Sequence, residues 1–90
     1  MKRVEIVAAQ AIQEDLLDAL EHYGVPKKYT IIPIAHGVGS TNPKLGNEVW
    51  PEENFILIIY CQEEMLDRIE QAITLIEKKY DQEGIGYFVL

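Results

Sequence analysis

An uninterrupted apolar segment, residues 55–61, constrains the fold of this chain more than any other feature. It reads Phe-Ile-Leu-Ile-Ile-Tyr-Cys, which has the length of one strand and lacks the alternation of a half-exposed strand. Both faces of this strand are therefore expected to be covered. The two alternating sets of side chains are Phe55, Leu57, Ile59 and Cys61 on one face and Ile56, Ile58 and Tyr60 on the other. The sequence leaves open which set faces the core.

Five further segments complete the pattern of a small α+β fold. Residues 4–9, 29–35 and 87–90 are short runs rich in β-branched and aromatic residues, as strands are. Apolar residues recur at helical spacing over 13–23, where Gly24 is expected to end the helix, and over 65–80. Pro33 lies within the strand 29–35 and cannot donate a ladder hydrogen bond, so this strand is expected at an edge of the sheet.

The order β-α-β-β-α-β predicts a ferredoxin-like sandwich that spans residues 1–90 as a single domain. Its four-stranded antiparallel sheet carries two helices on one face, with strands 4–9 and 55–61 at the centre. The other face would lie bare, with an alternate row of side chains from each central strand. Hydrophobic residues make up 48% of the chain, more than one small core needs. We therefore expect other copies of the chain to cover the bare face in a closed ring.

The charge of the chain excludes several classes of partner. Fifteen acidic and eight basic residues give a formal net charge of −7, which disfavours nucleic acid and anionic membranes. No apolar run is long enough to span a membrane, and Glu5 interrupts any signal-peptide core at the start. A single cysteine, Cys61, allows neither an internal disulfide nor a cysteine-based zinc site. We expect a cytoplasmic protein without membrane insertion.

The long segment between the second and third strands, residues 36–54, is the leading candidate for a functional loop. Loops of this length in compact domains usually bind something or are disordered. It contains three glycines, two prolines and the only tryptophan of the chain. One interpretation is a recognition loop with Trp50 as an anchor; the other is an excursion of the sheet in which Trp50 packs on a neighbouring subunit. The residues expected to contact a partner are Lys44, Leu45, Val49 and Trp50.

Other candidate sites in the sequence are weaker. Backbone amides of the segment Gly37-Val38-Gly39-Ser40 could approach an anion, although such a glycine pair also occurs at a simple strand exit. His22 and His36 lack a second ligand at metal spacing, so no metal site is predicted. Cys61 ends a buried strand and is expected to act as a small hydrophobic residue. No set of nucleophile, base and orienting group can be assembled, so no catalytic residue is predicted.

Nearly the whole chain resembles the P-II-like signalling proteins, which are small trimeric regulators with this fold. Residues 1–7 are similar to their first strand, and residues 16–25 to their first helix and its glycine stop. The segment His36-Gly37-Val38-Gly39 resembles the glycine-rich entry to their long T-loop, and residues 62–73 resemble their second helix.

The resemblance implies a trimer whose subunit clefts bind adenine nucleotides or other small effectors. The T-loop would correspond to residues 39–54, and the second loop framing the cleft to residues 81–86. Where the family has a phosphate-binding lysine, the segment 82–86 has no Lys or Arg and carries Glu83. The resemblance makes an adenine nucleotide one candidate effector, but the phosphate-binding basic residues are absent, so no cofactor is assigned. The expected ligand contacts are Gly37, Val38, Gly39, Ser40, Thr41, Gly84 and Gly86.

The sequence thus predicts a non-enzymatic regulator that binds a small effector between subunits of a homotrimer. Its loop 39–54 would contact a protein target such as a transporter, an enzyme or another regulator. Two alternatives stay open. One is a metal-responsive trimer of the divalent-cation-tolerance type, with His36 or His22 meeting acidic groups across an interface. The other is a small ferredoxin-like enzyme with an apolar cavity between helices and sheet.

Overall fold

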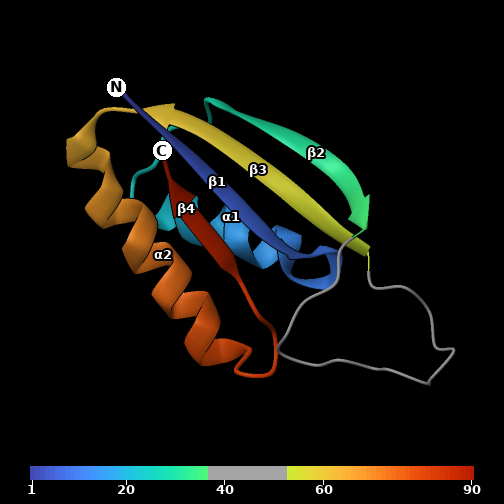
Figure 1. Ribbon diagram of the computed structural model, residues 1–90. Helices are drawn as coiled ribbons and strands as arrows, with labels where there is room; N and C mark the ends of the chain where they lie inside the picture. The colour runs from blue at the N-terminus through green and yellow to red at the C-terminus, as the bar shows by residue number, and fades with distance from the viewer. Residues whose placement is uncertain (37–52) are drawn as a thin grey trace, which may run out of the picture.

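Figure 1 shows the computed structural model, which describes residues 1–36 and 53–90, with the backbone alone described for 34–36. Along these residues, strands and helices follow one another in the predicted order. The elements are β1 (Lys2–Ala9), the 3-10 turn η1 (Gln10–Ile12), α1 (Gln13–His22), β2 (Tyr29–His36), β3 (Glu53–Cys61), the 3-10 turn η2 (Glu63–Met65), α2 (Leu66–Lys79) and β4 (Gly86–Val89).

The strands form one antiparallel sheet in the order β2-β3-β1-β4. This confirms the ferredoxin-like fold, with β1 and β3 at the centre. The edge position predicted from Pro33 is also confirmed. The register of β2 against β3 shifts between Ile32 and Ala35, around the proline, and the Pro33 carbonyl accepts a hydrogen bond from the side chain of Gln10.

Both helices lie on the same face of the sheet (Figure 1), and the hydrophobic core lies between them and the central strands. The set of β3 side chains that includes Phe55 and Leu57 faces the helices, and these two residues are fully buried. This decides the choice that the sequence left open. The helices contribute Leu16, Ala19 and Leu20 from α1, and Ile69, Ala72, Ile73 and Ile76 from α2.

The opposite face of the sheet, here called the open face, is not covered by any described residue. Residues paired across neighbouring strands share a face, so the register identifies its apolar members. They are Val7 of β1, Ile32 of β2, Ile56, Ile58 and Tyr60 of β3, and Phe88 of β4. The row from β1 differs from the expected apolar one, because it begins with Arg3 and Glu5, which form an ion pair of 2.8 Å.

The first helix ends one residue earlier than expected, and its glycine explains why. Gly24 has a φ of +82°, a left-handed conformation that glycine adopts without steric cost. The N–H of Gly24 donates to the carbonyl of Glu21, and the N–H of Val25 donates to that of Leu20. These two hydrogen bonds form a Schellman motif, and the buried Val25 turns the chain back toward the core.

Candidate functional site

The residues singled out from the sequence fall into two groups, of which the structure describes one. Gly84 is exposed in the connection after α2, and Gly86 is the first residue of β4. The remaining predicted contacts lie outside the described residues. These are Gly37, Val38, Gly39, Ser40 and Thr41 for the ligand, and Lys44, Leu45, Val49 and Trp50 for the partner.

The register of the sheet places the start of β4 and the end of β2 at the same end of the molecule. Gly86 pairs with Val7, close to the end of β1, and Ala9 pairs with Asn54, which in turn pairs with Ala35. The strand order nevertheless puts the two at opposite edges. Three spacings between strands separate them, which is about 14 Å. A small ion therefore cannot contact both strand ends of one subunit at once.

The backbone at Gly86 lies close to two side chains of the open face. A methyl group added there would lie 3.0 Å from Cε2 of Phe88 and 3.6 Å from Cβ of Val7. The Phe88 ring is 53% exposed, so it has room to turn away from such a group. The absence of a side chain at Gly86 thus lets the Phe88 ring lie close to the backbone at the start of β4, and any larger residue there would have to displace the ring.

A cluster of three polar side chains joins the end of α2 to the start of α1, just before the connection that carries Gly84. The Asp15 carboxylate accepts hydrogen bonds from the Lys79 ammonium, at 3.1 Å, and from the Tyr80 hydroxyl. The bond from Tyr80, followed by that from Lys79, lowers the pKa of Asp15. The bond to Asp15 raises the pKa of Lys79 and that of Tyr80.

Sequence reasoning missed this cluster because it treated Asp15 and Lys79 separately, as favourable charges at two helix ends. The predicted topology contained the missing information. Strands β1 and β3 are antiparallel, so the helix that follows each one runs antiparallel to the other. The start of α1 must then lie beside the end of α2, where an acidic and a basic residue can pair.

The connection between α2 and β4 offers little positive charge to an anionic ligand. Asp81 and Glu83 are acidic, and residues 81–86 contain no lysine or arginine. The ammonium of Lys79 is bound to Asp15. An anion held near Gly84 and Gly86 would therefore depend on backbone N–H groups.

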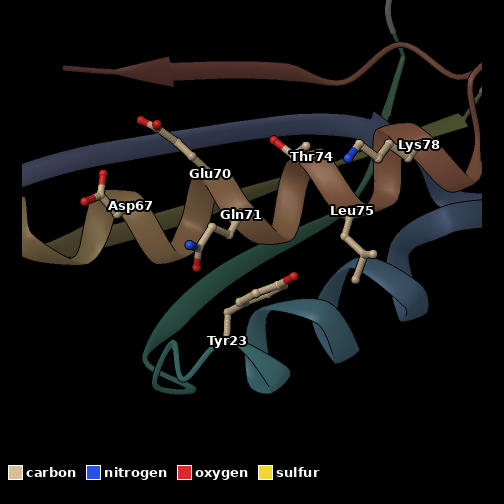
Figure 2. A pocket seen from close by; sticks show the side chains of 7 residues that line it. All are labelled: Tyr23, Asp67, Glu70, Gln71, Thr74, Leu75 and Lys78. Carbon is tan, nitrogen blue, oxygen red and sulfur yellow. The ribbon is translucent and has the colours of Figure 1, made fainter.

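An open groove of about 430 Å³ lies on the outer side of α2. Figure 2 shows α2 side chains along it and Tyr23, just after α1, beneath them. Its lining residues are Tyr23, Asp67, Glu70, Gln71, Thr74, Leu75 and Lys78. Sequence reasoning did not anticipate this groove, and none of the predicted site residues that the structure describes lines it. It also lies outside the core. The enzyme alternative requires a cavity within the core, between the helices and the sheet.

The Tyr87 hydroxyl connects β4 to this side of α2 by donating a hydrogen bond of 2.9 Å to Glu70. Burial of the phenol, together with the hydrogen bond to Glu70, raises the pKa of Tyr87 well above its ordinary value. This tyrosine therefore stays protonated throughout the physiological range and holds Glu70 in place.

The other candidate residues lie apart from these features. His22 is exposed, with its ring edge-on to that of Tyr23 at 4.9 Å between centroids. Cys61 is partly buried, and burial raises the pKa of its thiol. Within residues 1–36 and 53–90, no group of three His, Cys, Asp or Glu side chains is placed to hold a metal ion. No helix in this part of the chain is long and apolar enough to cross a membrane.

The sequence matches the family model of the nitrogen regulatory protein P-II over residues 1–89. No curated protein matches the chain. Among solved structures, it is similar to a PII-like signalling protein from Thermus thermophilus, with 29% sequence identity and a TM-score of 0.67. That match covers 99% of this chain and 83% of the other.

The fold is also similar to that of CPII, a nitrogen regulatory PII-like protein from Thiomonas intermedia. The structure of CPII bound to ADP, AMP and bicarbonate shares 20% identity with this chain, with a TM-score of 0.68 and coverage of 99% of this chain and 84% of CPII. The apo form of CPII shares 18% identity, with a TM-score of 0.65 and coverage of 99% and 87%.

Proposed function

This chain belongs to the nitrogen regulatory protein P-II family, and from this premise we propose that it is a non-enzymatic signalling protein that works as a homotrimer. It binds a small effector in the clefts between subunits and contacts a protein target through residues 39–54. Residues 1–90 act as one domain, and the protein works in the cytoplasm.

The open face of the sheet is the observation that carries this proposal. Ile32, Tyr60 and Phe88 are 41%, 56% and 53% exposed in the single chain. Side chains of this kind, gathered on one face, are typical of interaction surfaces rather than of free monomers. Burial of this face between subunits would remove them from water and leave the helices outside.

The separation of the two glycine segments supports a ligand site between subunits. Within one subunit, the end of β2 and the start of β4 lie at opposite edges of the sheet, about 14 Å apart. In a ring of subunits, the segment that follows β2 in one subunit can lie beside the start of β4 in the next. The proposed ligand contacts are Gly37, Val38, Gly39, Ser40, Thr41, Gly84 and Gly86.

The composition of the segment 81–86, on the β4 side of the proposed cleft, favours a small or modestly charged effector over a nucleoside triphosphate. The segment 81–86 has no cation, so several phosphate charges would lack a counter-charge there. CPII has been solved with ADP, AMP and bicarbonate, and these are the first effectors to test. The proposed contacts to the protein target are Lys44, Leu45, Val49 and Trp50.

Two measurements test this function. Sedimentation velocity of the full chain at micromolar concentration should show a trimer, and a stable monomer would refute the assembly. Titration with ADP, AMP and bicarbonate should change the fluorescence of Trp50, the only tryptophan, and release heat in calorimetry. If none of the three gives a response by either method, the proposed class of effector is wrong.

A matched pair of variants locates the site. Gly86→Ala places a methyl group against the Phe88 ring and should weaken effector binding in a folded protein. Leu75→Ala changes an exposed side chain of the groove on α2 and should leave effector binding unchanged. The reverse result would move the site from the start of β4 to the helix layer.

A further inference from the structure

A polar cluster of Arg3, Glu5 and Tyr60 interrupts the apolar open face. The Arg3 guanidinium donates one hydrogen bond to the Glu5 carboxylate and one to the Tyr60 hydroxyl, each 2.8 Å long. Its central carbon lies 5.5 Å from the centre of the Tyr60 ring, within the range of a cation–π contact. The charge of Arg3 is thus balanced within its own subunit.

The backbone holds this polar cluster in place from both sides. Arg3 pairs with Tyr60 of β3, and its N–H and carbonyl form hydrogen bonds of 3.2 and 2.8 Å with Leu90 on the other side. The Arg3 and Glu5 side chains are 41% and 30% exposed. Their geometry is therefore set before any partner covers the face.

The charge of the chain is divided unequally between the two layers of the fold. The strands hold two basic and two acidic residues, so the sheet is formally neutral. The helices and 3-10 turns hold nine acidic and three basic residues, a formal charge of −6 out of the −7 of the whole chain. Two copies approaching through their helix layers would repel each other. Approach through the open face avoids this repulsion.

We propose that the polar cluster of Arg3, Glu5 and Tyr60 is a specificity determinant of the interface between copies of this chain. The occupant of the open face is a second copy of the chain. It associates with the face when the Arg3–Glu5 pair is intact, and only weakly when one of the two charges is left unpaired. This inference rests on the assembly proposed above. Removal of one partner leaves the other charge without compensation as the interface closes, which is costly, whereas an intact pair enters as a unit.

The test compares association constants from analytical ultracentrifugation of the full chain. Arg3→Met and Glu5→Gln should each lower the association constant about a hundredfold or more. The double change Arg3→Glu/Glu5→Arg restores a pair of opposite charges and should recover most of this loss. Lys28→Met and Glu77→Gln make the same changes in charge at exposed positions outside the sheet, and should shift the constant less than about threefold.

Circular dichroism and thermal unfolding confirm that each variant is folded. If Arg3→Met does not fold, Arg3→Lys takes its place: it keeps the charge but cannot reach both Glu5 and Tyr60 with a planar fork, so it should weaken association by a smaller factor. A wild-type oligomer whose association is unchanged by folded variants at Arg3 and Glu5 overturns this inference alone. A monomeric wild type overturns both the inference and the assembly on which it rests.

Discussion

The adjacent residues Leu57 and Ile58 point to opposite faces of β3, so alanine at each position should disturb a different equilibrium. Leu57 is fully buried and pairs with Ile6 on one side and Ile31 on the other. Strands flank it and the helices cover it, so the surroundings cannot collapse into the space left by Leu57→Ala. We expect a loss of about 3 kcal/mol in the free energy of unfolding. With a urea dependence of about 1 kcal/mol per molar, the midpoint should fall by about 3 M.

Ile58→Ala is the matched control on the open face. Its side chain is only partly buried in the single chain, so truncation should cost folding about 1 kcal/mol or less. In the proposed trimer Ile58 would be buried, and the association constant should therefore fall. Urea unfolding at subunit concentrations low enough to keep the protein monomeric measures the first effect, and ultracentrifugation at higher concentration the second. Equal shifts of the two urea midpoints would refute the assignment of the faces. Unchanged association of Ile58→Ala would refute the burial of the open face.

Three other changes test local features of the fold. Because the pKa of Asp15 is lowered in the folded protein, its carboxylate stabilises the fold at pH values above its ordinary pKa of 3.8, and this stabilisation is lost as the pH falls through the lowered pKa. The Tm difference between wild type and Asp15→Asn should therefore be full at neutral pH and disappear in acid. Gly24→Ala should cost about 1–2 kcal/mol in thermal unfolding, because its φ is +82°, whereas Gly84→Ala should cost less. In an alkaline absorbance titration Tyr87 should ionise well above the ordinary pKa of tyrosine, and Tyr87→Phe should remove that late step; an unchanged curve would contradict its burial.

The elements with local constraints were predictable from the sequence. Pro33 lacks a donor, so it could only sit at an edge, and the apolar segment 55–61 required a central position. Gly24 ended the first helix because only a left-handed residue completes its terminal hydrogen bonds. Each of these predictions depended on one residue or one short run, and the structure confirms the position of each in the fold.

Features that depend on two distant segments were not predictable in the same way. The alternating sets on β3 are equally apolar, so only packing against the helices could assign Leu57 to the core. The hydrogen bonds of Asp15 join residues more than sixty positions apart. The candidate site is harder still, because residues 37–52 lie outside the described structure and the proposed cleft needs a second subunit. Gly84 and Gly86 thus keep the role of predicted contacts.

The two edges of the sheet bear on how growth of an assembly would stop. Exposed edges let proteins add strand to strand without limit, which leads to fibres. Here the β2 edge is broken by Pro33 and a shift in register, and β4 offers only the four residues Gly86–Val89. Among the described residues, the apolar surface left for association is instead the open face of the sheet, and contacts through such a face can close into a ring. Concentrated samples should accordingly yield discrete particles rather than fibrils.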